Sequence, residues 1–145
     1  MTSLFDELNT QNDKITEISI ILSHLITERS LCDNSITQAL FFEYVTLVKE
    51  HLNTEDLHIF PVLLRCNDEH AQTAADNFMG GSVEIKRIFK SYLRKWCRRD
   101  HLMVGRKHEE FINDSRDMFR IVLERIQNET EKLYPMVRIA SKEAA

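Results

Sequence analysis

Apolar residues recur every three or four positions along most of the chain, which is the spacing of one face of an α-helix. Polar residues that can cap helices interrupt this pattern at residues 32–35 and 66–68, and residues 98–106 form a third connection. The ends, residues 1–8 and 140–145, are expected to be loose. Four long helices joined by short loops are typical of an up-down-up-down four-helix bundle, so the pattern predicts an all-α fold. The predicted helices cover roughly residues 10–29, 35–65, 69–97 and 107–138.

Two prolines and a glycine pair modify these helices. Pro61 should kink or end the second helix near residue 60, and Pro135 lies at the matching place in the fourth. Gly80 and Gly81 mark either a weak point in the third helix or a close approach of another helix.

Composition favours one helical domain that covers residues 1–145, with its core at about 10–138. A chain of 145 residues has the usual size of a single domain, and 43% hydrophobic residues suffice for a core. The formal net charge of -4 argues against general attraction to nucleic acid or anionic membranes. Widely spaced Cys32, Cys66 and Cys97 predict reduced thiols. With no signal-peptide pattern and no apolar run of membrane-spanning length, the expected location is cytoplasmic.

One phrase occurs twice, once in the second predicted helix and once in the fourth. The first copy reads HLNTEDLHIFP and the second reads RIQNETEKLYP. Aligning their final prolines superimposes Glu55 on Glu129 and His51 on Arg125. Both glutamates fall in the apolar stripe of their helix, where an unpaired charge is costly. The repeat therefore predicts that two carboxylates, from two helices, share one buried site.

Histidines near these carboxylates suggest a metal centre. His51, Glu55 and His58 follow one another at spacings of four and three residues, so they share one helix face. His24 lies at the margin of the apolar stripe of the first helix. Carboxylates that bridge metal ions, completed by neutral imidazoles, are the ligands of iron and manganese sites in helical bundles. The candidate metal ligands are His24, His51, Glu55, His58 and Glu129.

Arg125 supports a second interpretation of the same residues. It lies one turn before Glu129 and could neutralise that carboxylate or Glu55 without a metal, while a permanent cation there would repel Fe²⁺ or Mn²⁺. Tyr44 or Tyr134 could hydrogen-bond Glu55. A guanidinium paired directly with a buried carboxylate would favour a metal-free bundle that binds a partner protein. A guanidinium turned to solvent would favour the metal centre.

The third predicted helix and the loop after it carry a basic stretch in an otherwise acidic chain. This stretch is either a solvated helix face or a docking surface for an acidic protein partner. No nucleic-acid-binding motif accompanies it, so neither nucleic acid nor membrane is the expected partner. Phosphate-loop, nucleophile-elbow and zinc-finger spacings are absent as well, and no catalytic mechanism is indicated. The basic residues are Lys86, Arg87, Lys90, Arg94, Lys95, Arg98, Arg99, Arg106 and Lys107.

At the repeated phrase the chain resembles the hemerythrin-like (HHE cation-binding) domains. The family's phrase is H-x-x-x-E, an acidic residue and then an aromatic residue followed by Pro, and residues 51–61 match it. His24 matches by position the family's histidine in helix one. The resemblance implies a four-helix bundle that holds a non-heme di-iron centre and, in some members, binds or senses oxygen.

The chain departs from the family in two helices. Arg125 stands in place of the helix-four histidine, although Glu129 keeps the carboxylate, and the third helix offers no inward histidine. The expected function is a domain that binds non-heme iron, as one ion or two, or another divalent metal, for oxygen or redox sensing or metal handling. The alternative is a metal-free regulatory protein-interaction module. An enzyme that consumes oxygen or peroxide would need an open metal position.

Overall fold

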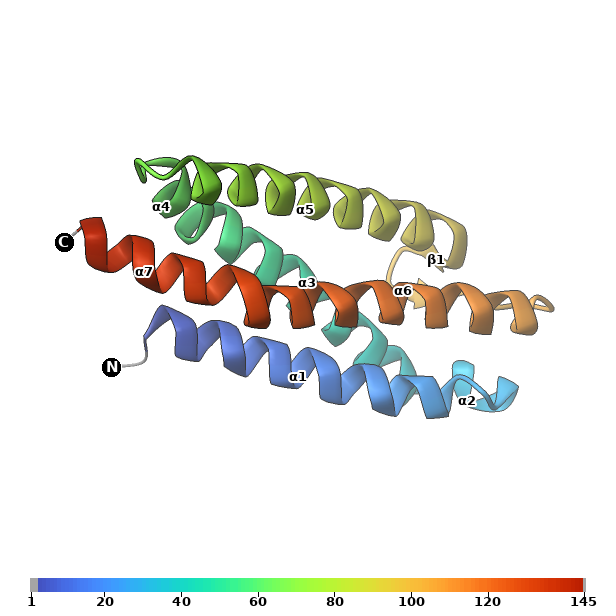
Figure 1. Cartoon of the computed structure of the whole chain (residues 1–145). Coiled ribbons are helices and arrows are strands. Elements are labelled where there is room, and N and C mark those ends of the chain that lie inside the picture. The colour runs from blue at the N-terminus through green and yellow to red at the C-terminus, as the bar shows by residue number, and fades with distance from the viewer. Residues whose placement is uncertain (1–2, 145) are drawn as a thin grey trace.

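The computed structural model describes the backbone of residues 3–144 and the side chains of residues 3–142, and this part of the chain is mostly helical. The all-α class expected from the apolar spacing is therefore confirmed. The elements, shown in Figure 1, are α1 (Leu4–Leu25), α2 (Arg29–Cys32), α3 (Ser35–His58), α4 (Phe60–Leu64), α5 (Glu69–Trp96), β1 (Cys97–Arg98), β2 (His101–Leu102), α6 (His108–Asn128), the π-helical turn η1 (Glu129–Leu133) and α7 (Tyr134–Ala144).

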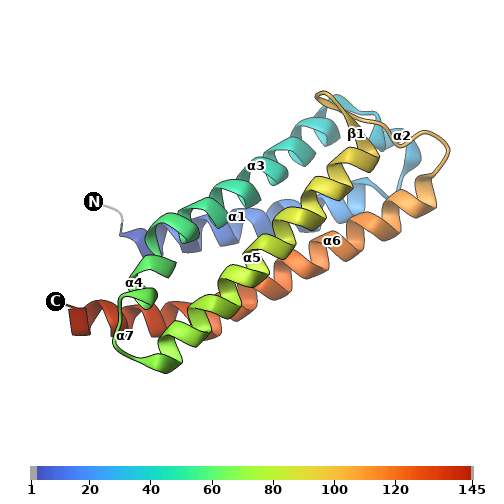
Figure 2. The ribbon, with the colours of Figure 1, turned by 90° about the horizontal axis from the view of Figure 1, so that it is seen from above.

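Four helical rods run side by side (Figures 1 and 2). The first is α1, the second is α3 with α4, the third is α5, and the fourth runs from α6 through η1 into α7. The first rod packs against the second and the fourth, and α5 packs against α3, α4 and α6. The start of α1 and the end of α7 lie at the end of the molecule that carries α4 (Figure 1). Within the described residues, no helix combines the length and the apolar character needed to cross a lipid bilayer.

The first and last helices extend further than the apolar pattern predicted. Ser3 caps α1 by accepting a hydrogen bond from the backbone N–H of Asp6, whose carboxylate accepts one from Ser3 in return. This capping box starts the helix at residue 4 and lets Leu8 become fully buried. At the other end, α7 continues to Ala144 and buries Ala140. The expectation of loose ends is therefore wrong for residues 4–8 and for the backbone of residues 140–144.

Both prolines disturb their helices, in different ways. As predicted, Pro61 breaks the second rod, because α3 ends at His58 and α4 starts at Phe60 with the proline in its first turn. Pro135 follows the π-helical turn, in which the N–H of Tyr134 donates to the carbonyl of Glu129, five residues back. A proline nitrogen cannot make the ordinary bond four residues back, and a widened turn accommodates that loss.

The predicted loop at residues 98–106 contains a small hairpin that the sequence analysis missed. Cys97 pairs with Leu102 and Arg98 with His101 in an antiparallel arrangement. Arg99 has a φ of 59°, a left-handed conformation that is uncommon for residues other than Gly and Asn. Because hairpin turns prefer those two residues, no hairpin was predicted at this arginine.

The interior consists of two apolar clusters separated by a layer of polar side chains. Three rods repeat the same order: a residue of the first cluster, a polar residue, and a residue of the second cluster. These triplets are Ile15, Asn12 and Leu8 in the first rod, Leu52, Glu55 and Ile59 in the second, and Val122, Arg125 and Leu133 in the fourth. The polar layer contains the candidate functional site.

Candidate functional site

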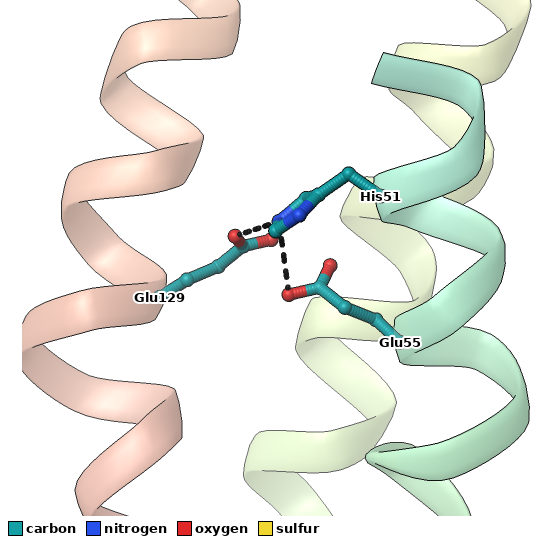
Figure 3. A group of neighbouring side chains, drawn as sticks. All are labelled: His51, Glu55 and Glu129. Carbon is teal, nitrogen blue, oxygen red and sulfur yellow. Dashed lines mark hydrogen bonds and ion pairs between the residues drawn. The ribbon is translucent and has the colours of Figure 1, made fainter. Parts of the chain in front are cut away.

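Three of the predicted ligand residues meet in the polar layer (Figure 3). His51 and Glu55 come from α3, and Glu129 comes from the first position of η1. One donor atom from each residue lies within 4.8 Å of the other two. The Nε2 atom of His51 is 2.8 Å from Oε1 of Glu129 and 3.5 Å from Oε2 of Glu55. Both glutamates are 0% exposed, so the two carboxylates share one buried site, as the repeated phrase predicted.

His24 and His58 do not join this site, and their placement in one common ligand set is wrong. Both side chains are exposed to solvent. His24 lies twelve residues beyond Asn12 of the polar layer, which is about 18 Å along α1. His58 is the last residue of α3, where the chain turns toward the kink at Pro61. A helical wheel assumes one continuous helix, so it does not show that the helix containing His58 ends at that residue.

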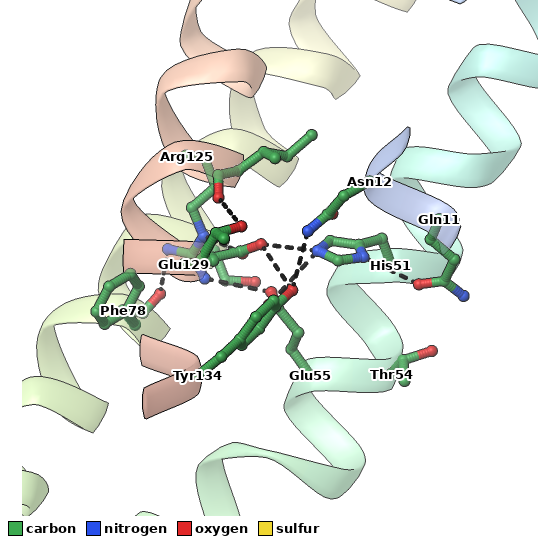
Figure 4. Close-up of polar contacts among 12 residues, drawn as sticks. Gln11, Asn12, His51, Thr54, Glu55, Phe78, Arg125, Glu129 and Tyr134 are labelled. Atoms are coloured by element: carbon green, nitrogen blue, oxygen red, sulfur yellow. Dashed lines mark hydrogen bonds and ion pairs between the residues drawn. The ribbon is translucent and has the colours of Figure 1, made fainter. Parts of the chain in front are cut away.

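Arg125 pairs directly with the buried carboxylates (Figure 4). Its Nε donates to Oε2 of Glu129 over 2.7 Å, and its Nη2 lies 3.5 Å from Oε1 of Glu55. The side chain is only 9% exposed. The guanidinium therefore pairs with the carboxylates and does not turn to solvent. This is the arrangement that was expected to favour a metal-free bundle.

Helix α5 supplies a cradle for this guanidinium. The Nη1 of Arg125 donates to the backbone carbonyl of Phe78 over 2.8 Å, and the guanidinium carbon lies 5.0 Å from the centre of the Phe78 ring. A Cβ atom built on Gly81 would lie only 2.7 Å from the same Nη1. The missing side chain of Gly81 is thus the space that Arg125 occupies. The glycine pair was predicted to mark either a weak point or a close approach of another helix. Gly81 marks a close approach, which the Arg125 side chain makes.

The neighbouring glycines should respond oppositely to alanine. A Cβ atom at position 80, within α5, would have no atom within 4 Å. Because alanine favours a helix more than glycine does, Gly80→Ala should raise the free energy of unfolding by about 0.5–1 kcal/mol. Gly81→Ala should lower it by about 1 kcal/mol, because the displaced guanidinium loses its bond to Phe78. Urea denaturation of both variants measures the contrast. In an Arg125→Ala background the two substitutions should have similar effects, and a contrast that persists there would contradict the cradle.

Further polar side chains complete the layer, and the sequence analysis missed most of them (Figure 4). Gln11 accepts a hydrogen bond from Nδ1 of His51 over 2.9 Å. The Tyr134 hydroxyl accepts from Nδ2 of Asn12 over 3.2 Å and lies 3.4–3.5 Å from both carboxylates. The suggested contact of Glu55 with Tyr134 is thus present, at the long end of the range. The Tyr44 hydroxyl has no hydrogen-bond partner among the described residues. Asn12 could have been recognised from the sequence, because it is a polar residue within the apolar stripe of the first helix.

Burial and pairing give the three titrating groups different proton affinities. Burial alone would lower the pKa of His51, but hydrogen bonds to Glu129 and Glu55 outweigh it and raise that pKa from 6.5 to about 9. Burial opposes ionisation of Glu129 too, yet its bonds to His51 and Glu55 and the charges of His51 and Arg125 hold its pKa below the usual range. Burial and the neighbouring Glu129 raise the pKa of Glu55. Glu55 is therefore the carboxylate that takes up a proton first on acidification.

The cluster can balance its charges without a metal. With all groups ionised, protonated His51 and Arg125 offset the negative charges of Glu55 and Glu129. A divalent ion would require neutral His51 as ligand, and with Arg125 still present the centre would then carry one excess positive charge. Oε1 of Glu55 and Nη2 of Arg125 lack hydrogen bonds but face each other as an ion pair at 3.5 Å. This distance equals that between Nε2 of His51 and Oε2 of Glu55, so Glu55 is held more loosely than Glu129.

The di-iron centre implied by the resemblance does not fit these residues. Two ions would have to share one imidazole and two carboxylates, and the guanidinium of Arg125 already contacts both carboxylates. Comparison of the chain with protein-family models, curated proteins and solved structures finds no match. The hemerythrin-like assignment therefore stays a resemblance carried by the repeated phrase.

Proposed function

We propose that this chain is a hemerythrin-like, up-down-up-down helical bundle that acts in the cytoplasm as a metal-independent, regulatory protein-interaction module. Arg125 and protonated His51 supply the positive charge that a metal would supply in the related domains. The observation that carries the proposal is the direct pairing of Arg125 with Glu129, supported by the cradle at Phe78 and Gly81.

Charge and geometry support a permanent role for the guanidinium. A buried carboxylate needs a cation or a proton, and Arg125 reaches both carboxylates from one position. The guanidinium keeps its charge at every physiological pH and presents its N–H groups in a fixed plane. Because the backbone of α5 also accepts one of these N–H groups, moving Arg125 aside for an ion would leave several buried groups unpaired.

A single divalent ion is the second candidate, favoured by the convergence of His51, Glu55 and Glu129. Nδ1 of His51 is anchored by Gln11, as the second nitrogen of a metal-bound histidine usually is. Nε2 and the carboxylate oxygens would hold the ion, and iron there would supply redox chemistry. Metal binding would have to release the proton of His51, so affinity would fall at low pH.

Metal analysis of protein expressed in iron-supplemented medium separates the two candidates. We expect fewer than about 0.1 transition-metal ion per chain and no change in unfolding temperature on adding Fe²⁺ anaerobically or Co²⁺. One ion per chain, lost in His51→Ala, would instead establish the metal centre.

A variant that should gain metal binding provides a second test, in which the expected result is the presence of bound metal and not its absence. Arg125→His removes the competing charge and restores a second H-x-x-x-E phrase, so it should bind Co²⁺ with visible absorption bands that the wild type lacks. Arg120→His provides the matched control, because Arg120 is exposed on the same helix and, among the described residues, pairs with Asp117 and Glu124 alone. Cobalt bands in the control would show that binding does not involve the polar layer.

A further inference from the structure

The second half of α5 and the strand that follows it form a segment in which every charged residue is a cation. Residues 85–99 contain seven lysines and arginines and no aspartate or glutamate. The whole chain has a formal net charge of -4, so the residues outside this segment carry -11. Opposite charges are therefore separated along the chain. The seven cations are Lys86, Arg87, Lys90, Arg94, Lys95, Arg98 and Arg99.

Three of these cations are used inside the molecule. Lys86 pairs with Asp56 of α3, and Lys95 pairs with two acidic residues of α6. Both lysines therefore join α5 to a neighbouring helix. Arg87 pairs with Glu84, one turn before it on α5. The charges of these three residues are already matched within the fold.

The other four cations form a surface that we call the basic strip, namely Lys90, Arg94, Arg98 and Arg99. All four are exposed, and none forms an ion pair or a side-chain hydrogen bond within the described part of the chain. Lys90 and Arg94 are one turn apart on α5, about 6 Å along its axis. Arg98 and Arg99 follow in β1 and the turn after it, at the end of the molecule away from α4 (Figure 1). Carboxylates one turn apart on another helix have the same 6 Å spacing.

The turn after β1 holds an arginine at a strained position. Arg99 has a φ of 59°, in the left-handed region that glycine enters freely and that a residue with a Cβ atom enters at a cost. Backbone strain of this kind is concentrated at functional sites, where a particular side chain is needed. The strain at Arg99 therefore favours a role for its guanidinium outside the turn.

An exposed apolar pair precedes the basic strip on the same side of α5. Met79 is 36% exposed and Val83 is 68% exposed, and they lie one turn apart. Val83 lies seven residues before Lys90, so their side chains stand on one side of the helix, two turns apart. The row from Met79 to Arg94 covers about 22 Å. A partner along this row would meet apolar side chains at one end and cations at the other.

The helices on either side of α5 restrict this partner to a narrow one. Helices α3 and α6 both pack against α5 and carry exposed acidic residues. A bilayer or a nucleic-acid duplex is wide enough to bring its phosphates against these residues, whereas one helix, about 10 Å wide, stays on the row. The described aromatic side chains within residues 79–99 are buried, so none is available to stack on bases. The acidic residues are Glu43 and Glu50 of α3 and Asp117 and Glu124 of α6.

We propose that this side of α5 and the basic strip bind one acidic amphipathic helix of a partner protein. Leucine-like residues of the partner would lie against Met79 and Val83, and glutamates or aspartates one turn apart would lie against the basic strip. The inference rests on the proposed function as an interaction module and names the partner's chemistry. Charge pairs give the partner its orientation and association rate, and the apolar contacts add affinity.

A designed peptide tests the proposal directly. The probe is a fluorescein-labelled helical peptide with two leucines one turn apart and, two turns further on, three glutamates one turn apart. Its control has the same composition, with the glutamates distributed around the helix. Fluorescence anisotropy should show binding of the ordered peptide alone, and added salt should weaken that binding.

Paired charge reversals locate the binding surface. Lys90→Glu/Arg94→Glu should weaken binding of the probe at least about tenfold, since two charge pairs become repulsive. Arg116→Glu/Lys142→Glu makes the same change at an exposed arginine of α6 and an exposed lysine of α7, and it should alter affinity less than about threefold. A probe with lysines in place of its glutamates should bind Lys90→Glu/Arg94→Glu more tightly than the wild type, a gain that unfolding cannot produce.

Arg99→Gly separates binding from stability. Glycine adopts the left-handed conformation without strain, so the unfolding temperature should rise. Loss of one cation of the basic strip should nevertheless weaken binding of the probe about threefold. A variant that is more stable and binds less tightly cannot owe the loss to unfolding.

Several results would overturn the proposal. These are equal binding of the control peptide, equal loss in the two charge-reversed pairs, unchanged affinity in Arg99→Gly, and binding of phosphatidylserine vesicles, duplex DNA or a second copy of the chain through the basic strip without peptide binding. Metal content, measured on the same preparation, reports separately on the proposed metal independence. Metal-free protein that fails to bind the probe removes the basic strip as a docking surface and leaves the polar layer as described.

Discussion

Replacing Arg125 by methionine should lower the free energy of unfolding by about 3–5 kcal/mol, the usual cost of removing one partner from a buried charge pair. Methionine keeps most of the aliphatic stem, so the loss reports on charge and hydrogen bonding. Glu55 and Glu129 would then face each other with His51 as their only cation. Equilibrium urea denaturation followed by circular dichroism measures the difference.

Arg120→Met is the matched control for this experiment. Arg120 lies on the same helix and forms two ion pairs, but its side chain is 59% exposed, so its loss should cost less than about 0.5 kcal/mol. The Arg125 variant should also recover part of its stability near pH 5, because the Glu55 carboxyl can take up a proton there instead. Similar small losses for both variants would show that the guanidinium does not stabilise the centre.

Glu129→Gln should be about as costly, again about 3–5 kcal/mol, although it changes hardly any volume. Glu129 accepts hydrogen bonds from His51 and Arg125 and is 0% exposed. The amide leaves both cations buried beside Glu55 alone. Chemical denaturation at pH 6 gives the size of the effect. In the double variant Arg125→Met/Glu129→Gln the losses should be clearly less than additive, since the second change removes a group that the first left unpaired.

The same variant should change how stability depends on pH. The pKa of His51 is raised in the folded state, so its contribution is complete below pH 6.5 and is lost as the pH rises through about 9. The pKa of Glu129 is lowered, so its contribution is lost as the pH falls below 4.5. Glu129→Gln should reduce both slopes, and an NMR titration should show a lower pKa for His51. An unchanged histidine pKa would contradict the pairing of these two residues.

The helices and the shared site were predictable because both follow from local spacing. Periodic apolar residues gave the four rods, and the repeated phrase located Glu55 and Glu129 in apolar stripes that had to face the interior. The kink at Pro61 followed from proline chemistry. The start of α1 was missed although Ser3 and Asp6 have the spacing of a capping box, because apolar spacing alone was used to place the boundary.

The composition of the site was harder to predict, because it depends on contacts between rods. Arg125 has a long flexible side chain, and its direction is decided by a backbone carbonyl of Phe78 that carries no sequence signature. Gln11 and Asn12 contribute from α1 through single atoms. His58 has suitable spacing but is exposed, since spacing along one helix does not show where that helix ends.

The polar layer between the two apolar clusters also restricts how the rods can slide past one another. Moving one rod lengthwise by a single turn, about 5.4 Å, would bring Glu55 or Glu129 against hydrocarbon and separate it from Arg125. Apolar side chains alone tolerate such a shift much better, because one leucine can replace another with little change in contact. The charges in the middle therefore select a single axial alignment of the helices, whatever the protein binds at its surface.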